Sequence, residues 1–286
     1  MHKELTIVLP SYKSRELIIQ HINNLSKKFK FIIVDNSYDK KLKKDLEGKY
    51  KNVKVYLRKN IGYGSAINYG SRYVKTKYFL VMNPDTKIYK NTLKNLLLAA
   101  KKIKVFGALS PDYIENKKKN EKIRKHNIIN QKQLDGGAML FDKKIFEKIK
   151  DFDEKIFLYY EENDFYQKCE NLKYNLFLIK NSYFYHSQKG DSSSAIYKSN
   201  KEKYYGYLVG GWHGQWSKFY YLKKYNGFLY SLIKCMPNLI INILQLIFKS
   251  LILSKKTKYL YFKIEGLISS ILGLPSYKRN KYDNFE

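Results

Sequence analysis

The stretch LTIVLPSY, which runs from Leu5 to Tyr12, decides the fold. A short apolar run that stops at a proline and then becomes polar is typical of a buried strand followed by a loop. Three similar apolar runs follow, and residues with helical spacing lie between them. These runs are Phe31–Val34, Val53–Leu57 and Tyr78–Met82. Strands that alternate with helices predict an α/β fold, in which a mostly parallel sheet is covered by helices on both faces.

Polar residues follow each of these four predicted strands. Sheets of this kind bind ligands at the carboxyl ends of their strands. One polar loop is ordinary turn chemistry, whereas four at the same edge predict a site. The four segments are Pro10-Ser11-Tyr12, Asp35-Asn36-Ser37, Arg58-Lys59-Asn60 and Asn83-Pro84-Asp85.

The chain is strongly basic. Its 286 residues include 55 Lys and Arg against 25 Asp and Glu, which gives a formal net charge of +30. Such a charge attracts nucleic acid, anionic lipid headgroups or phosphorylated substrates. The abundance of Lys, Ile and Tyr also fits a general compositional bias, so the charge alone does not select a partner.

The two cysteines, Cys169 and Cys235, form neither a CxxC motif nor a zinc-binding spacing. We therefore expect no disulfide framework and no cysteine metal site, which fits a reducing cytosolic environment. We also expect no signal peptide, because Met1–Glu4 leads directly into the first strand.

The carboxy-terminal third of the chain changes character. A polar stripe with helical spacing is formed by Lys234, Asn238, Asn242, Gln245 and Lys249. The residues between them are almost all Leu, Ile or Phe. Because the charge-free run Cys235–Phe248 is shorter than the ~20 residues of a membrane span, we expect an amphipathic helix that lies in the membrane interface. Nearby lysines favour an anionic surface, and a core helix or dimer interface is the alternative.

The motifs together resemble family 2 glycosyltransferases with the GT-A fold, and most of all the rhamnosyltransferase branch. They keep the family's order from Leu5 to His186. The matching segments are Ile7–Tyr12, Val34–Ser37, Asn60–Gly64 with Asn68 and Gly70, Met82–Thr86, Gly136–Met139, Phe157–Asp164 and His186. The resemblance implies a Rossmann-like GT-A domain over residues 1–225. Its nucleotide-binding half would cover about 1–100 and its acceptor-side half about 101–225, with an amphipathic helical tail over 226–286.

The resemblance implies that Asp85 binds Mg²⁺ or Mn²⁺ and that His186 reaches the metal or the diphosphate. A hard cation held by a carboxylate stabilises the charge that develops on a leaving diphosphate. Taken alone, Asn-Pro-Asp-Thr is also good turn and N-cap chemistry, and a lone histidine is more often structural.

Two adjacent acids, Glu161 and Glu162, follow the aromatic run Ile156–Tyr160. Neighbouring side chains cannot both face the same way, so we expect different roles for them. The resemblance places Glu162 where the family has its catalytic base, usually an aspartate, which accepts the proton of the acceptor hydroxyl. Glu161 is the alternative base, and either Glu161 or Asp164 could instead cap the following helix.

For the nucleotide, the resemblance implies that Asp35 accepts a hydrogen bond from the edge of the base. The other residues implied on the nucleotide side are Pro10, Ser11, Tyr12, Asn60, Gly62, Asn68 and Asn83. Those implied on the acceptor side are Gly136, Gly137 and Asp164. The glycines at 62 and 64 allow a tight turn, but they do not form the GxGxxG motif of dinucleotide-binding proteins.

The sequence therefore predicts an inverting, metal-dependent hexosyltransferase that uses a nucleotide-sugar donor, with dTDP-L-rhamnose as the candidate. The acceptor would be a glycan or lipid-linked sugar of cell-surface polysaccharide. The protein would bind peripherally to the anionic inner face of the cytoplasmic membrane, and a homodimer is left open.

Two other classes are weighed against this prediction. The charge and the tyrosines permit a basic nucleic-acid-binding protein, but acids crowded into one cleft would repel phosphates, so no specific nucleic acid is expected. A sugar nucleotidyltransferase on a similar sheet would need a glycine-rich, basic signature near the amino terminus, which Leu9-Pro10-Ser11-Tyr12 does not supply.

Overall fold

The structure, a computed structural model, describes residues 3–25, 29–114, 127–186, 199–252, 256–279 and 281. The chain divides into two compact units. Unit 1 comprises Met1–Ile61, Ser65–Phe152 and Phe165–Ser192, and unit 2 comprises Gly62–Gly64, Asp153–Asp164 and Ser193–Glu286. The lysine-rich segment 115–126 lies outside the described residues.

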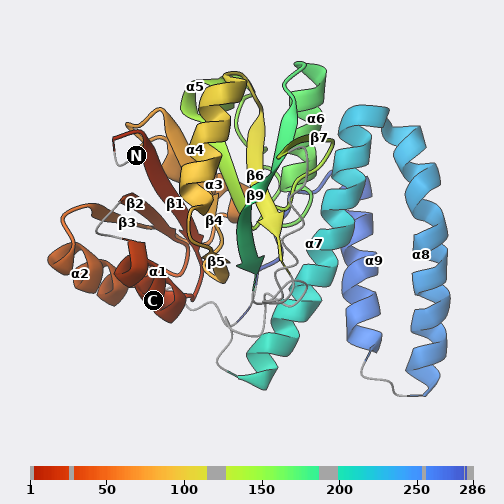
Figure 1. The fold of residues 1–286 in the computed structure, drawn as a ribbon. Coiled ribbons are helices and arrows are strands. Elements are labelled where there is room, and N and C mark those ends of the chain that lie inside the picture. The colour runs from red at the N-terminus through yellow and green to blue at the C-terminus, as the bar shows by residue number, and fades with distance from the viewer. Residues whose placement is uncertain are drawn as a thin grey trace. The chain divides into compact units, whose positions relative to one another are not determined.

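Unit 1 is built on one sheet, whose strands run in the order β3-β2-β1-β4-β8-β6-β9-β5, with β7 beside β9 (Figure 1). The strands are β1 (Leu5–Ser11), β2 (Lys30–Asp35), β3 (Val53–Leu57), β4 (Tyr78–Met82), β5 (Thr86–Ile88), β6 (Ala108–Tyr113), β7 (Ile128–Gln131), β8 (Ala138–Asp142) and β9 (Leu176–His186). Strands β3, β2, β1 and β4 are all parallel, which confirms the sequence prediction and puts their carboxyl ends at one edge. The other half is mixed, because β8 runs antiparallel to β4 and β6.

Helices cover both faces of this sheet. Successive side chains of a strand point to opposite sides, so strands that are apolar throughout need a cover on each face. The helices are α1 (Arg15–Leu25), α2 (Lys40–Lys49), α3 (Tyr63–Ser71), α4 (Thr92–Ile103), α5 (Lys143–Lys148) and α6 (Glu161–Asn171). Ile7 and Leu9 of β1 share a core cluster with apolar residues of α1, α2 and α4. Val8 faces the other side, where a Cβ atom on Gly70 of α3 would lie 2.9 Å from its Cγ1. Each buried Leu, Ile or Val of this core contributes roughly 1.5–3 kcal/mol.

A cluster of phenylalanine rings fixes α5 and the body of α6 against the second face. Phe141 of β8 lies 5.0 Å from Phe146 of α5 and 5.4 Å from Phe165 of α6, measured between ring centroids. Phe79 of β4 joins them at 5.1 Å from Phe146. The boundary between the units falls inside α6, after Asp164, so this cluster holds the part of the helix that belongs to unit 1.

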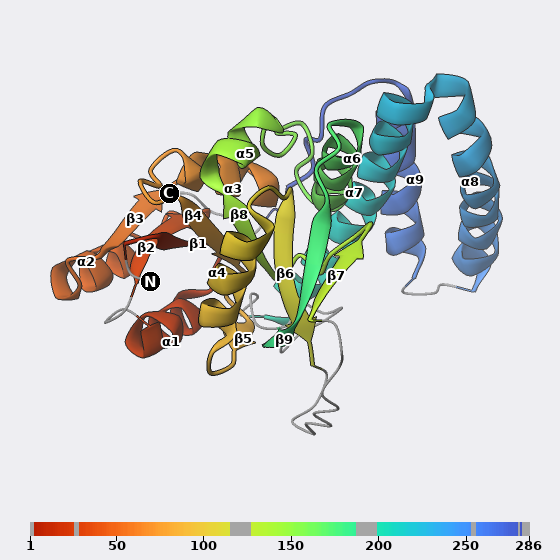
Figure 2. The ribbon, with the colours of Figure 1, turned by 45° about the horizontal axis from the view of Figure 1, so that its top comes forward.

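Unit 2 contains three long helices that lie side by side in both views (Figures 1 and 2): α7 (Asn200–Asn226), α8 (Phe228–Leu251) and α9 (Thr257–Ile271). Helices α7 and α9 approach so closely that a Cβ atom on Gly266 would lie 2.2 Å from the carbonyl oxygen of Trp212. Because α7 groups with α8 and α9, these units differ from the predicted division at 225/226, which stays a prediction.

Helix α8 presents most of its apolar side chains to solvent. Its buried residues are only Ser231, Cys235, Leu239 and Asn242. It is long and apolar enough, by length and composition, to cross a membrane. The charge-free run Cys235–Phe248 is only part of this helix, which extends over 24 residues with Pro237 in its interior.

Candidate active site

The loop after β4 is a tight turn that carries Asp85. The backbone N–H and the hydroxyl of Thr86 both donate to the carbonyl oxygen of Asn83, at 3.1 and 2.7 Å. The backbone N–H of Asn83 donates to the carbonyl of Gly137 at 3.0 Å. Strand β5 then pairs with β9 in a register that sets Thr86 opposite His186. The turn chemistry and the candidate metal ligand are therefore features of the same segment.

Asp85 and His186 are brought together by this pairing. Nε2 of His186 lies 2.9 Å from Oδ1 of Asp85, and the two side chains are 13% and 12% exposed. Despite that distance, Nε2 is buried and makes no aligned hydrogen bond. Ligands in adjacent positions of an octahedral ion with bonds of ~2.1 Å lie about 3 Å apart, so the pair fits two ligands of one divalent cation.

The described residues contain no cluster of three or more His, Cys, Asp or Glu side chains able to hold a metal. Asp85 and His186 would therefore supply part of a coordination shell. Divalent cations at nucleotide sites are commonly held by one or two carboxylates plus substrate phosphates. The pair fits such a shared site and does not fit a closed structural one.

His21 of α1 contacts the turn that carries Asp85. Its Nε2 lies 2.8 Å from the carbonyl oxygen of Pro84, which requires the proton to sit on Nε2. Burial lowers the pKa of His21, although the hydrogen bond to Pro84 and the charge of Asp85 oppose that shift. The neutral imidazole therefore ties α1 to the loop that holds Asp85, a contact between residues too far apart in the sequence for any local pattern to reveal.

Asp35 lies at the carboxyl end of β2 and is 1% exposed. Its Oδ1 accepts hydrogen bonds from the hydroxyls of Ser11 at 3.2 Å and Ser37 at 2.7 Å, and its Oδ2 accepts one from the backbone N–H of Asp39 at 2.7 Å. Burial raises the pKa of Asp35, while these three donors oppose the shift. Asp35 thus joins β1, β2 and the start of α2, and its contact with a nucleobase stays a prediction.

Asn68, which the sequence predicts on the nucleotide side, pairs with buried backbone groups. It is 2% exposed, and its amide group both donates to the carbonyl oxygen and accepts from the N–H of Phe152, each at 2.9 Å. An amide that pairs with a buried backbone in both directions is a structural clamp. Asn68 therefore holds α3 against Phe152, and its contact with a nucleotide stays a prediction.

Gly62 has the tight geometry that the sequence suggested, but its close neighbour is protein. Its φ is +93°, and a Cβ atom there would lie 2.4 Å from the carbonyl oxygen of Phe157 in unit 2. The next residue, Tyr63, donates its backbone N–H to the same oxygen at 3.2 Å. A side chain at position 62 is thus excluded twice, by backbone conformation and by contact.

Most of the other predicted residues lie at or beside the carboxyl edge of the parallel strands. Pro10 pairs with Val34 inside the sheet, and Tyr12 and Asn60 are partly buried just beyond β1 and β3. Gly137 follows Gly136 and lies beside Asn83, and a Cβ atom there would be 2.8 Å from the ring of Phe184. The structure therefore explains Gly137 by packing, and the acceptor role of the two glycines stays a prediction.

The start of α6 in unit 2 is strained. Tyr159 and Tyr160 have φ values of +65° and +69°, a conformation that non-glycine residues seldom adopt. Strain of this kind persists only where the surroundings enforce it, and it gathers at functional sites. The strained turn places Glu161 and Glu162 in the first turn of the helix. Nothing in the sequence of the two tyrosines predicts this backbone conformation.

The two glutamates occupy different environments. Glu161 is 3% exposed, and its buried Oε2 has no hydrogen-bond partner. Burial first, and then the charge of Glu162, raise the pKa of Glu161 well above its usual value. Glu162 is partly exposed. The two adjacent acids thus differ in burial: Glu161 is enclosed and its pKa is raised, whereas Glu162 is partly exposed, and their separate roles stay a prediction.

Asp164 makes buried polar contacts within unit 2, and its acceptor role stays a prediction. It is 0% exposed, and its Oδ1 lies 2.5 Å from Nζ of Lys224 and 2.8 Å from the hydroxyl of Tyr225. Burial alone would lower the pKa of Lys224, but its hydrogen bonds to Asp153 and Asp164 raise it overall. The side chain therefore anchors the end of α7 to α6, a long-range pairing that the sequence does not show.

The comparisons with known proteins agree with these motifs. The model of "Glycosyl transferase family 2" matches residues 6–177. The low-salt glycan biosynthesis hexosyltransferase Agl10 of Haloferax volcanii is 25% identical over 207 residues, which cover 62% of this chain and 64% of that protein. The match thus spans somewhat less than two thirds of the relative.

Two solved structures share the fold. TarS from S. aureus aligns with a TM-score of 0.50 and 14% identity, over 72% of this chain and 38% of TarS. GalNAc-T7, solved with UDP, GalNAc and Mn²⁺, aligns with a TM-score of 0.53 and 12% identity, over 77% of this chain and 50% of that one. Because the family model covers more than half of the sequence, the chain belongs to glycosyl transferase family 2.

Proposed function

We propose that this protein is an inverting glycosyltransferase that moves a sugar from a nucleotide-sugar donor to a glycan or lipid-linked acceptor. The observation that carries the proposal is the Asp85–His186 pair, 2.9 Å apart at the carboxyl edge of a parallel sheet in a member of family 2. The hexosyltransferase named among its relatives supports a hexose as the transferred group. dTDP-L-rhamnose is our candidate donor, on the motifs quoted above.

Glu162 serves as the base. The acceptor hydroxyl gives its proton to the Glu162 carboxylate while its oxygen forms a bond to the anomeric carbon, and the bond from that carbon to the diphosphate oxygen breaks. A single displacement of this kind inverts the configuration. Glu161 beside it is buried with a raised pKa, whereas Glu162 is partly exposed, and this difference favours Glu162 as the acid that meets the acceptor.

Asp85 and His186 would hold a divalent cation, which neutralises charge on the leaving diphosphate when it is bound. GalNAc-T7 contains Mn²⁺ together with UDP, which supports a metal in this position. Removing the carboxylate with Asp85→Asn should weaken the binding of Mn²⁺, measured with UDP by calorimetry, by tenfold or more. Asp45→Asn, which makes the same change at an exposed carboxylate of α2 that pairs with Arg15, is the matched control.

Glu162→Gln tests the chemistry. Amide nitrogen cannot accept the hydroxyl proton, so we expect transfer to fall by about 10²–10⁴-fold, measured as release of nucleoside diphosphate from the preferred donor. Binding of the nucleotide should stay within about twofold of the unchanged protein. Turnover near that of the unchanged protein would reject Glu162 as the base.

Thermal stabilisation can identify the donor. A ligand that binds the folded protein at 100 times its dissociation constant adds about 2.7 kcal/mol to stability. A panel of sugar nucleotides with Mn²⁺ or Mg²⁺ should therefore raise the Tm most for the true donor. A larger shift with another sugar nucleotide than with dTDP-L-rhamnose would replace the rhamnosyl assignment and leave the enzyme class intact.

Helix α8 supports our proposal that the protein binds the inner face of the cytoplasmic membrane. Ile240, Leu244 and Phe248 are 51%, 61% and 62% exposed and repeat every four residues, so they lie on one face. The net charge of +30 favours anionic lipid. Changing all three to serine should abolish cosedimentation with vesicles that contain phosphatidylglycerol. Release of the unchanged protein by high salt or carbonate indicates an interfacial helix, and retention indicates a span.

A further inference from the structure

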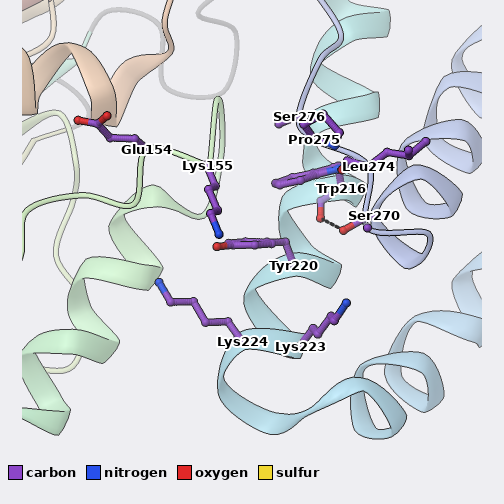
Figure 3. A pocket seen from close by; sticks show the side chains of 11 residues that line it. Glu154, Lys155, Trp216, Tyr220, Lys223, Lys224, Ser270, Leu274, Pro275 and Ser276 are labelled. Atoms are coloured by element: carbon purple, nitrogen blue, oxygen red, sulfur yellow. Dashed lines mark hydrogen bonds between the residues drawn. The ribbon is translucent and has the colours of Figure 1, made fainter.

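Unit 2 contains an open cavity of about 650 Å³, within the ~300–1,000 Å³ typical of small-molecule sites. Its walls come from α7, from the segment after α9, and from the loop that precedes α6. None of the residues assigned to the proposed transfer reaction lines it. The residues that the argument uses are Lys155, Trp216, Tyr220 and Lys223, with Leu274 at the rim (Figure 3).

The aromatic wall of this cavity is fixed in place. The rings of Trp216 and Tyr220 are stacked, with centroids 5.1 Å apart and planes inclined by 13°. The indole N–H of Trp216 donates to the carbonyl of Leu274, and the hydroxyl of Ser270 donates to the carbonyl of Trp216, each at 2.9 Å. The Tyr220 hydroxyl donates to Asp153 at 2.9 Å. A rigid aromatic face suits the C–H face of a sugar ring, because the ring quadrupole is negative above its plane.

The lysines of the cavity are of two kinds. Nζ of Lys224 is engaged by Asp153 and Asp164, at 2.7 and 2.5 Å. Within the described parts of the chain, Lys155 and Lys223 form no ion pair with a carboxylate. Figure 3 shows Lys155 reaching toward Tyr220, whereas Glu154, the one acid among the lining residues, points away from it. Nζ of Lys223 lies 5.5 Å from the ring centroid of Phe228 and, like Lys155, has no carboxylate partner among the residues that the structure describes, so both lining lysines can still pair with an anion.

We propose that this cavity binds an anionic saccharide, in which a sugar ring lies on Tyr220 and a phosphate or carboxylate group contacts Lys155 and Lys223. Family membership favours a sugar over a nucleobase on the aromatic face. As the acceptor of the transfer reaction, such a ligand rests on the proposed function. The binding itself does not, because the cavity lies wholly within unit 2.

Calorimetry with glucose 1-phosphate as the probe tests the proposal, with UDP and Mn²⁺ present in excess so that the donor site is filled. The probe should bind at least tenfold more tightly than either glucose or inorganic phosphate. Lys155→Gln with Lys223→Gln should weaken binding by tenfold or more, because charge-assisted hydrogen bonds are lost. Lys218→Gln, on the same helix but outside the cavity, should bind as the unchanged protein does.

Tyr220 gives a second pair of variants. Tyr220→Phe keeps the ring and loses only the bond to Asp153, so binding should persist within about threefold, whereas Tyr220→Ala should weaken it by about tenfold. Both lysines are exposed, so the double lysine variant stays informative even if Tyr220→Ala does not fold. Binding that is equal in the double lysine variant and the unchanged protein overturns the proposal, as does binding of UMP that depends on the same lysines.

A further binding measurement distinguishes a lipid-linked saccharide from a soluble one. A decyl phosphodiester of glucose that binds more tightly than glucose 1-phosphate indicates a lipid-linked ligand, and equal affinity indicates a soluble one; both outcomes support the cavity. Failure of the Glu162→Gln test with intact probe binding removes the proposed function alone. Loss of transfer in Glu162→Gln without any probe binding removes this inference alone.

Discussion

Asp35 in unit 1 and Glu161 in unit 2 are both almost completely buried acids, at 1% and 3% exposure, and burial raises the pKa of each. Their surroundings are opposite. Asp35 accepts three hydrogen bonds from Ser11, Ser37 and Asp39. Glu161 has an oxygen with no donor and a second acid as its neighbour.

The difference shows two ways in which this fold accommodates a buried acid. A buried carboxylate that is fully hydrogen-bonded strengthens the fold, because its donors would otherwise be left unsatisfied. A buried carboxyl group with one unsatisfied oxygen costs stability in its charged form, so its pKa rises. Such a cost survives in a native protein where the group serves another purpose, and here the strained turn at Tyr159 and Tyr160 holds it beside Glu162.

The largest expected effect comes from Asp35→Ala. This change leaves the Asp39 N–H and two hydroxyls without their acceptor, and we expect a loss of about 3 kcal/mol in the free energy of unfolding. Asp35→Asn is the control, since a flipped amide can accept from Asp39 while it donates to the two serines, and it should cost less than half as much. Urea unfolding followed by circular dichroism measures both. Equal losses in the two variants would contradict this account of the network.

The sequence was sufficient to predict the part of the fold in which each apolar strand is followed by a helix that returns the chain to the same edge of the sheet. Apolar runs that alternate with helices predicted β1 to β4 and the helices on both faces, and the family comparison confirms the motifs that follow them. The sequence did not predict the antiparallel pairing of β8 with β4 and β6. The direction of a strand depends on which edge of the sheet the preceding segment reaches, and local sequence does not show this. The charge-free run gave too short a length for α8, since packing with α7 and α9 continues the helix through Pro237.

The candidate site was predictable as residue types but not as environments. The motifs selected Asp85 and His186, which the β5–β9 register does place together. They also selected Asn68 and Asp164, whose partners Phe152 and Lys224 lie 84 and 60 residues away in the chain. A polar residue in a motif has the same letter whether it faces a ligand or a buried backbone group. Only the fold distinguishes the two.

The pH dependence of stability offers a second test of the comparison. The pKa of Glu161 is raised in the folded state, so its contribution is fully present below the unfolded value of 4.5 and is lost as pH rises through the folded pKa. We expect the stability of unit 2 to fall by up to ~1.4 kcal/mol per pH unit in that window relative to Glu161→Gln. Both tryptophans, Trp212 and Trp216, belong to unit 2, so their fluorescence during urea unfolding reports on it.

Other acids titrate in both proteins, and the difference between the unchanged protein and Glu161→Gln removes their contribution. At pH 4 the two should be equally stable within about 1 kcal/mol, because the protonated acid and the amide are both neutral. A difference that grows in the opposite direction, with the unchanged protein gaining stability as pH rises, would mean that Glu161 is charged and satisfied in the folded state.

The smallest expected effect concerns the individual hydrogen bonds that Asp35 accepts. Ser37→Ala removes the 2.7 Å hydrogen bond to Asp35, and we expect a loss of about 1 kcal/mol in the free energy of unfolding. The pKa of Asp35 should rise further, since Ser37 is one of the donors that hold it down. Ser11→Ala removes a longer bond of 3.2 Å and should cost less. If Ser11→Ala costs more than Ser37→Ala, then Ser11 stabilises the sheet edge through another contact, and the strength of the network does not follow its hydrogen-bond lengths.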